Sequence, residues 1–302
     1  MKHLFLLNPA AGKRDCTAEL AAQIESACRP RGLAYEIRVS AAPGDCTKFA
    51  RAACETGEEL RIYACGGDGT LNEVVSGAAG FANAAVTHFP CGSGNDFIRI
   101  FGDTAPFSDL TQLLDPAETA IDLIAVNDRW SINIASIGVD ARIAVEAQQY
   151  KRLPGVTGSG AYLISVVTNL FKGIRRPYEI DIDGERFSGE QTLLCVCNGR
   201  YYGGGMCPMP DAEPDDGLLD VLLVRGVGVP TFAKLFGKYK SGGYAELPEY
   251  VRHFRAKTVT VRANEESVVN LDGEGYRAAE VRFAVRPNAL RFFYPKAVFY
   301  RG

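Results

Sequence analysis

Short strand-like runs alternate with stretches of helical periodicity throughout the first third of the chain. Residues 4–7, 35–39, 60–65 and 85–89 are predicted strands. Between them, apolar side chains recur at helical spacing, as at Leu20, Ile24 and Ala27. Repeated strand–helix alternation predicts a parallel sheet with helices on both of its faces. Residues 1–123 are therefore expected to form a Rossmann-like α/β domain.

The pattern changes near Ile121, beyond which strand-like runs dominate. Asp183-Gly184 and Asp272-Gly273 are sequences typical of hairpin turns. Residues 124–287 are therefore predicted to form a mostly antiparallel β-sandwich domain. The sequence leaves open whether the tail, residues 288–302, joins the first domain. Strands are expected at 130–134, 178–182, 193–197, 218–224, 258–262 and 281–285, and helices near 160–171 and 230–240.

Bulk composition indicates a two-domain globular protein without a nucleic-acid partner. The 302 residues are 47% apolar and 23% charged, which is typical of a chain that buries a large core. The net charge of −3 argues against a nucleic-acid protein, since such proteins usually carry a basic excess. The nine cysteines form no C-x-x-C pair, so reduced thiols in a cytoplasmic protein are expected. No stretch approaches the roughly 20 apolar residues of a membrane-spanning helix.

A glycine-rich loop, Gly66-Gly67-Asp68-Gly69-Thr70, stands between a predicted strand and a predicted helix. Glycines let the backbone turn sharply and approach a ligand closely. A helix start offers unpaired N–H groups and the positive end of a dipole to phosphate oxygens. Phosphate would repel Asp68, so its carboxylate is expected to face a cation or to accept a proton. A tight turn is the alternative interpretation, and the spacing fits neither a P-loop nor a dinucleotide fingerprint.

Three further motifs combine small residues with carboxylates. Residues 90–97, PCGSGNDF, again follow a predicted strand, and a turn with Asn95 as a helix cap is their alternative interpretation. Residues 211–220, DAEPDDGLLD, suit a hard cation in a bent loop and are equally typical of an acidic, solvated turn. Asp272-Gly273-Glu274 repeats the triplet Asp183-Gly184-Glu185, so the triplet alone indicates only a hairpin.

In this order and spacing, the four motifs resemble the diacylglycerol kinase catalytic-domain family, which includes bacterial diacylglycerol kinases, sphingosine kinases and ceramide kinases. The likeness involves residues 66–74, 90–97, 203–220 and 272–274, and it extends to residues 8–12. It implies an ATP- and Mg²⁺-dependent lipid kinase that transfers the γ-phosphate to a lipid hydroxyl. Diacylglycerol is the first candidate acceptor, and sphingoid, ceramide-type and phosphatidylglycerol alcohols are the alternatives.

The resemblance also implies roles for individual residues. In similar proteins, ATP lies in the cleft between the α/β domain and the β-sandwich domain. Glu274 matches the residue proposed as general base, and Asp68 and Asp272 match acidic groups of the active site. Serine stands at positions 40 and 93, where many relatives have threonine. The residues expected to line the nucleotide are Asn8, Pro9, Ala10, Ala11, Gly12, Ser40, Gly66, Gly67, Asp68, Gly69, Thr70, Asn72, Ser93, Asp96 and Asp122.

A structural Mg²⁺ is implied as well. In relatives, the second aspartate of an Asp-Asp-Gly sequence and two nearby carbonyls hold the ion, which corresponds here to Asp216, Glu213 and Leu218. Magnesium prefers oxygen ligands, and clustered carboxylates would repel one another without a cation among them. Glu274 would take the proton of the lipid hydroxyl as this hydroxyl attacks the γ-phosphate.

A lipid acceptor requires transient contact with a membrane surface. Basic and apolar residues mix at Lys172, Arg175 and Arg176, and again over residues 232–240. Such a face suits anionic lipid, and an ordinary amphipathic helix with a solvated basic side is the alternative. The protein is expected to be cytoplasmic and peripheral to the membrane. The formation of a homodimer is left open.

Other functional classes fit the sequence less well. NAD kinases and phosphofructokinases share a Gly-Gly-Asp-Gly loop, so the first motif does not exclude a kinase of a soluble substrate. Residues 92–97 and 215–220 favour a lipid kinase over that alternative. A non-catalytic nucleotide or lipid sensor is expected to have lost acidic residues that are present here. A serine hydrolase is disfavoured because the chain lacks a G-x-S-x-G sequence.

Overall fold

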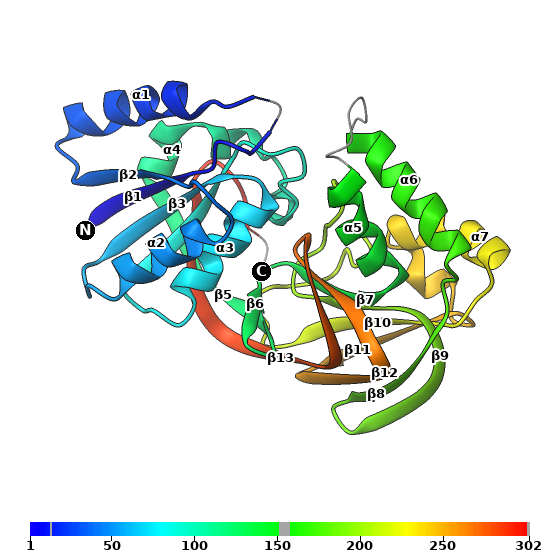
Figure 1. Ribbon diagram of the computed structural model, residues 1–302. Helices are drawn as coiled ribbons and strands as arrows, with labels where there is room; N and C mark the ends of the chain where they lie inside the picture. The colour runs from blue at the N-terminus through cyan, green and yellow to red at the C-terminus, as the bar shows by residue number, and fades with distance from the viewer. Residues whose placement is uncertain (13, 151–157, 301–302) are drawn as a thin grey trace. The chain divides into compact units, whose positions relative to one another are not determined.

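The computed structural model of the protein describes residues 1–12, 14–150 and 158–300. The chain forms two compact units (Figure 1). Met1–Leu123, Pro214–Asp216 and Arg286–Gly302 make up the first unit, and Ile124–Glu213 with Gly217–Val285 make up the second. The short segment Pro214–Asp216 thus groups with the first unit, although the sequence alone placed it within the β-sandwich domain.

The first unit is a parallel sheet with helices on both faces (Figure 1). Its helices are α1 (Thr17–Cys28) and α4 (Leu110–Leu114) on one face, and α2 (Asp45–Cys54) and α3 (Asp68–Ala78) on the other. Arg291 and Phe292 pair in parallel with Ala85 and Val86, which answers the open question of the tail. The strand order is β2 (Tyr35–Val39), β1 (Lys2–Leu7), β3 (Leu60–Gly66), β4 (Ala84–Pro90) and the end of β13 (Glu274–Pro295).

The inner strands of this sheet have helices on both sides, which explains their sequences. β1, β3 and β4 are almost wholly buried. In the edge strand β2, apolar and charged residues alternate along the sequence, and the strand is only half-buried. Tyr63 of β3 joins three strands: its ring stacks on Phe5 at 4.1 Å and meets Phe293 edge-on at 5.0 Å between centroids. Its hydroxyl is 2.8 Å from Nδ1 of His3. These contacts fix the strands whose ends carry the glycine-rich loops.

The second unit is built around two long strands, β9 (Glu185–Cys197) and β12 (Thr258–Leu271), which pair in antiparallel fashion with the same two neighbours. Strand β8 (Arg176–Ile182) pairs with the first halves of both, and β7 (Ile134–Gly138) pairs with their second halves. This double pairing closes a β-sandwich around one apolar core. The remaining strands of the unit are β6 (Arg129–Ser131), β10 (Leu219–Arg225), β11 (Val251–Ala256) and the first part of β13, and β5 (Pro116–Val126) enters it from the first unit.

The second half of β9, residues 191–197, is buried on both faces, which explains the apolar run at its end. Leu194 and Val196 point into the core of the sandwich. Leu193, Cys195 and Cys197 point the other way, into a second core beneath the helices. The helices over this second core are α5 (Val139–Tyr150), α6 (Gly158–Phe171) and α7 (Val229–Lys240). Short 3₁₀ helices lie at Arg29–Arg31, Phe97–Phe101, Ala105–Ser108 and Gly243–Glu246.

Two features of the second unit differ from the sequence-based expectation. The strand predicted at 130–134 is split into β6 and β7, because the N–H groups of Ile132, Asn133 and Ile134 donate to the Asp272 carboxylate rather than to a neighbouring strand. Helix α5 was not predicted at all. Among the described residues, no helix is both long and apolar enough to cross a membrane.

Candidate active site

Three loops of the first unit meet where parallel strands β1, β3 and β4 end. They are residues 8–12, 66–70 and 90–96. The Asn8 side-chain amide donates to the Thr70 hydroxyl at 2.9 Å, and the Asn8 backbone N–H donates to the Cys65 carbonyl at 3.0 Å. In open α/β sheets, ligands bind beyond the carboxyl ends of the strands. The three predicted loops therefore lie at the edge of the sheet where ligands of such folds bind.

The carbonyl oxygen of Gly66 accepts the hydrogen bonds that join the loop 66–70 to the loop 90–96. It accepts hydrogen bonds from the N–H groups of Cys91 at 2.8 Å and Gly92 at 3.1 Å. The third donor is Nε2 of His88, at 3.0 Å. Burial lowers the pKa of His88 to about 4, against the smaller opposing effect of its bond to Gly66. His88 is therefore neutral near pH 7 and carries its proton on Nε2, since a carbonyl can only accept.

The glycines of these loops are required by close backbone contacts. A Cβ on Gly92 would lie 2.5 Å from the Cα of Gly67, and a Cβ on Gly12 would lie 2.4 Å from the carbonyl oxygen of Cys91. Gly12 also has a φ of +80°, which favours glycine. The loops therefore pack backbone against backbone.

Asp68 clamps the third loop to the first turn of α3. Its Oδ2 accepts from the N–H of Asn95 at 2.9 Å, and its Oδ1 accepts from the N–H of Asp96 at 2.7 Å. A Cβ on Gly94 would lie 2.3 Å from Oδ2, so the glycine makes room for the carboxylate. The expectation that Asp68 faces a cation or takes a proton stays a prediction; the structure shows that both of its oxygens position the third loop.

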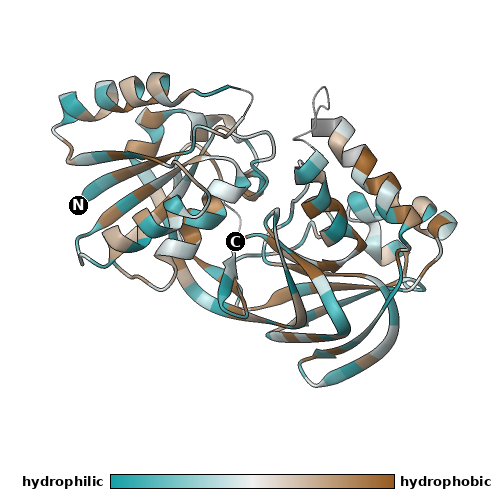
Figure 2. Cartoon of the chain, in the orientation of Figure 1, coloured by the Kyte–Doolittle hydropathy of each residue, from teal (hydrophilic) through white to brown (hydrophobic). Residues whose placement is uncertain are grey.

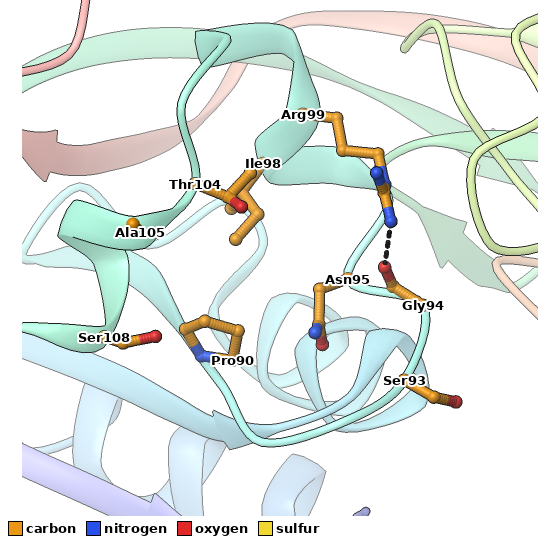
Figure 3. Close-up of a pocket in the computed structure, with 9 residues that line it drawn as sticks. All are labelled: Pro90, Ser93, Gly94, Asn95, Ile98, Arg99, Thr104, Ala105 and Ser108. Carbon is orange, nitrogen blue, oxygen red and sulfur yellow. Dashed lines mark hydrogen bonds between the residues drawn. The ribbon is translucent and has the colours of Figure 1, made fainter.

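Asp96 continues this arrangement into the next helix. It is buried, and its Oδ1 accepts from Nε of Arg99 at 3.1 Å. A second Arg99 nitrogen, Nη2, donates to the carbonyl of Gly94 at 3.1 Å (Figure 3). The loop therefore closes on itself around one guanidinium. Beside it lies a pocket of about 220 Å³, whose wall includes Pro90, Ser93, Ile98, Thr104 and Ser108 (Figure 3).

The first turn of α3 begins directly after the glycine-rich loop and contains Asp68. Its N-cap residue, Gly67, has an extended backbone and makes no side-chain cap hydrogen bond. Further along the helix, Thr70 and Asn72 are buried. On the neighbouring β1–β2 edge, the Ser40 hydroxyl is buried and lies 3.4 Å from the Leu7 carbonyl. Pro9, Ala10 and Ala11 follow Asn8 in a turn, in which the Ala10 N–H donates to Asn8 Oδ1 at 3.0 Å.

Asp122 holds three segments of the first unit together. Its side chain is fully buried, and Oδ1 accepts from the N–H of Asn288 at 2.8 Å. Its own N–H donates to the carbonyl of Pro214 at 2.6 Å. This last bond fixes the start of the Asp-Asp-Gly segment to β5. The nucleotide-lining role implied for Asp122 by the resemblance stays a prediction, and the structure shows that this residue anchors the segment that contains Asp216.

In the second unit, Asp272 and Glu274 belong to one tight hairpin between β12 and β13. Asp272 and Gly273 have φ values of +51° and +100°, as in a two-residue turn of the type that matches strand twist. Asp272 Oδ1 accepts from the Ser131 hydroxyl and from the N–H groups of Asn133 and Ile134, at 2.8–3.1 Å. Its Oδ2 accepts from the N–H of Ile132 at 2.9 Å.

Glu274, by contrast, has an exposed side chain at the first position of β13. Asp272 therefore anchors the turn, and the turn presents Glu274. The repeated triplet makes the same clamp on the other hairpin: the Asp183 carboxylate accepts from the N–H groups of Lys257 and Thr258, at 2.7 and 2.8 Å. These hydrogen bonds to the carboxylate lower the pKa of Asp183.

Comparison with known proteins identifies the family. A family model described as the diacylglycerol kinase catalytic domain matches residues 2–126, and one described as the YegS C-terminal NAD kinase beta sandwich-like domain matches residues 133–294. A protein named "Probable lipid kinase YegS-like" from Pseudomonas aeruginosa is 33% identical over 295 residues, which cover 97% of this chain and 93% of that protein. The chain belongs to the diacylglycerol kinase catalytic-domain family. It is accordingly a lipid kinase, and the family implies the use of ATP.

Two further comparisons agree with this assignment. A protein of the same name from Pseudomonas fluorescens is 32% identical to the lipid kinase over 300 residues, which cover 98% of this chain and 96% of that protein. The crystal structure of a diacylglycerol kinase from Bacillus anthracis matches 99% of this chain and 98% of its own with a TM-score of 0.70. At 23% sequence identity, this second likeness shows the fold alone.

The loops of the lipid kinase fit a phosphate-bearing nucleotide. Their backbones pack too closely for side chains, and the uncapped first turn of α3 adds N–H groups and a positive dipole end. The expected Mg²⁺ ligands also have suitable chemistry, since Asp216 supplies a carboxylate and Glu213 and Leu218 supply carbonyls around a bend at Gly217, which has a φ of +75°. Within the described ranges, no cluster of three or more metal-binding side chains occurs.

Two residues of the lipid kinase with buried polar side-chain atoms, His88 and Asp140, belong to no recognisable sequence motif. His88 lies within a predicted strand, and a lone histidine there indicates nothing about its contact with Gly66. Asp140 follows β7 at the start of α5, and neither carboxyl oxygen has a hydrogen-bond partner of normal geometry in the described part of the chain. Burial raises the pKa of Asp140 to about 6, although the Ser136 hydroxyl and the Ala141 N–H lie near enough to oppose the shift. Only the surrounding fold reveals either residue.

Proposed function

We propose that this lipid kinase transfers the γ-phosphate of ATP to the free hydroxyl of diacylglycerol, which gives phosphatidic acid and ADP. The observation that supports this most strongly is the packing of two glycine-rich loops, residues 66–70 and 90–96, which are held together through the Gly66 carbonyl and the Asp68 carboxylate. The family model, which is described as the diacylglycerol kinase catalytic domain, supports diacylglycerol as the acceptor. Other lipid alcohols are the competing acceptors.

The residues of the first unit bind and orient the nucleotide. Phosphate oxygens accept from the N–H groups at the start of α3 and along the glycine-rich loops. Asp68 and His88 do not touch the reacting atoms in this scheme; they hold the loops rigid through Asn95, Asp96 and Gly66. Positioning supplies much of the rate enhancement in phosphoryl transfer, since the protein does little covalent chemistry itself.

Asp216, together with the carbonyls of Glu213 and Leu218, would hold the Mg²⁺ ion. When bound, this ion supplies positive charge that offsets the carboxylates and the phosphate oxygens around it. The hydrogen bond from the Asp122 N–H to the Pro214 carbonyl fixes the segment that carries Asp216.

Glu274 acts as the general base. Its carboxylate accepts the proton of the lipid hydroxyl while the hydroxyl oxygen forms its bond to the γ-phosphorus, and the bond from that phosphorus to the ADP oxygen breaks. Asp272 is a positioning residue in this scheme, because its four hydrogen bonds hold the turn from which Glu274 projects.

The test is a labelled-ATP transfer assay over a panel of acceptors, with and without Mg²⁺. The panel contains diacylglycerol, phosphatidylglycerol, ceramide and sphingosine in mixed micelles, and NAD as the soluble acceptor. We expect label in phosphatidic acid, loss of transfer when the metal is chelated, and no label in NAD phosphate. Label in a different lipid would replace diacylglycerol as the acceptor, and label in NAD phosphate alone would overturn the proposal.

A further inference from the structure

Helix α6 exposes three apolar side chains, although Ala161 is buried and Val166 and Leu170 pack against the second core. Ile164, Val167 and Phe171 are 38%, 45% and 89% exposed, and their spacing places them on one side of the helix. On the opposite side, Ser165 and Asn169 are fully buried. Surface helices of globular proteins show the reverse arrangement. Figure 2 shows the hydrophobic residues along α6 in brown.

The buried polar side of α6 is specifically bonded to α5, so the orientation of the helix is fixed. The Ser165 hydroxyl donates to the carbonyl of Ile143 at 2.8 Å. The Asn169 amide donates to Oε2 of Glu146 at 2.9 Å. Rotation of α6 to hide the apolar side would break both bonds and leave buried polar groups without partners. The apolar side is therefore held outward by the fold.

Positive charge follows directly after this apolar stripe. Residues 172–176 contain Lys172, Arg175 and Arg176 and no carboxylate. Lys172 pairs with Glu146 at 2.9 Å and Arg175 pairs with Glu190 at 3.1 Å. The Arg176 guanidinium donates to the carbonyls of Arg175 and Lys172 and has no carboxylate partner in the described part of the chain. The end of α6 thus keeps a surplus positive charge beside its most exposed aromatic ring.

The same pair of helices contacts the hairpin that carries Glu274. A Cβ on Gly275 would lie 2.2 Å from a methyl carbon of Val145, so α5 packs directly on the start of β13. Helix α6 packs on α5 through Ser165 and Asn169. The exposed stripe and the proposed general base are therefore joined by two direct packing contacts within the second unit.

We infer that Ile164, Val167 and Phe171, with the basic segment 172–176, form the surface by which the lipid kinase docks on an anionic bilayer. Apolar side chains beside cations are the chemistry of interfacial helices, which insert the apolar side below the headgroups and leave the charges at headgroup level. The inference rests on the proposed function in one respect: a lipid acceptor presents its hydroxyl at that bilayer surface.

The test measures binding of the full-length protein to phosphatidylcholine vesicles with and without phosphatidylserine, in the absence of ATP. The variant is Phe171→Ser, and the matched control is Phe299→Ser, which removes a ring that is 71% exposed in the first unit. We expect Phe171→Ser to lower the vesicle partition coefficient about tenfold, in line with the loss of one inserted aromatic side chain. Arg176→Gln should weaken binding only to vesicles with phosphatidylserine, and added salt should do the same.

A second readout separates docking from chemistry. With a short-chain diacylglycerol dissolved as a monomer, Phe171→Ser should retain wild-type turnover, whereas turnover on vesicles should fall with binding. Equal vesicle binding by the wild-type protein and Phe171→Ser would overturn the docking surface, whatever the acceptor proves to be. Sedimentation of the wild-type protein as a dimer that Phe171→Ser converts to monomers would also overturn it, since the stripe would then join two copies. Lost docking without transfer to any lipid would refute the proposed function alone.

Discussion

Replacing Asp272 with asparagine should loosen the segment Ile132–Ile134 without removing the base. The carboxylate of Asp272 accepts four hydrogen bonds, one of them through Oδ2 from the N–H of Ile132. In Asp272→Asn, the retained oxygen keeps the three bonds at Oδ1 as neutral bonds. The new amide nitrogen can only donate, so it faces the Ile132 N–H without bonding to it. One lost bond to a charged acceptor and one unsatisfied N–H amount to about 3 kcal/mol.

Amide hydrogen exchange is the assay suited to this change, because it reports the opening of individual segments. A local loss of about 3 kcal/mol corresponds to roughly a hundredfold faster exchange at the amides of Ile132, Asn133 and Ile134. The matched control is Asp183→Asn in the other Asp-Gly-Glu hairpin, where the clamped N–H groups belong to Lys257 and Thr258. That carboxylate is exposed, so water can replace it and a loss of about 1 kcal/mol is expected.

Transfer activity decides what the Asp272 carboxylate does. Per folded molecule, Asp272→Asn should retain much more activity than Glu274→Gln, and Asp183→Asn should match the wild-type protein. Unchanged amide exchange at residues 132–134 would show that the Asp272 carboxylate does not hold this segment in place. Activity as low as that of Glu274→Gln, with unchanged exchange, would show that Asp272 takes part in the chemistry rather than in positioning.

Three further predictions concern single residues. Glu274→Gln should reduce phosphoryl transfer by two orders of magnitude or more. It should change the free energy of unfolding by less than about 0.5 kcal/mol, since the side chain is exposed. A stable, fully active variant would show that Glu274 is not the general base. The pKa of His88 is lowered from 6.5 to about 4, so the unfolded state binds the proton more tightly than the folded state. The free energy of unfolding should therefore be highest above pH 6.5 and should decrease below it, by about 3 kcal/mol at pH 4. A thermal unfolding midpoint that does not decrease from pH 7 to pH 4 would contradict this. The pKa of Asp140, raised from 3.8 to about 6, has the opposite sign, because the folded state binds the proton more tightly than the unfolded one and stability falls as the pH rises through 6. Asp140→Asn should therefore be more stable than the wild-type protein by about 3 kcal/mol at pH 8 and nearly equal at pH 4; a variant destabilised at pH 8 would show that the carboxylate is needed.

Local patterns were sufficient for the first unit. Strand β2 has the predicted bounds, and β1, β3 and β4 extend the predicted strands by only one or two residues at their ends. Their burial on both faces leaves little room for other structures. The two Asp-Gly turns were also recognised, because positive φ at both positions is a local requirement.

Contacts between segments that are distant in the sequence could not be predicted from local patterns. The strand predicted at 130–134 is broken by a carboxylate about 140 residues further along the chain, and no local pattern reveals this. The motif at 66–70 correctly marked a glycine-rich turn between a strand and a helix, but the N–H groups that donate to Asp68 lie on the next loop and could not be predicted from the motif.

Aspartates in this lipid kinase act mainly as acceptors for backbone N–H groups. Asp68, Asp122, Asp183 and Asp272 each bind N–H groups of a segment far away in the sequence. A carboxylate is suited to this work because it accepts several bonds at once, and bonds to a charged acceptor are stronger than neutral ones. A carboxylate engaged in this way loses much of its basicity, since every donor stabilises its ionised form. In the proposed mechanism, Asp272 accordingly holds the turn through its four hydrogen bonds, and the exposed side chain of Glu274 takes the proton.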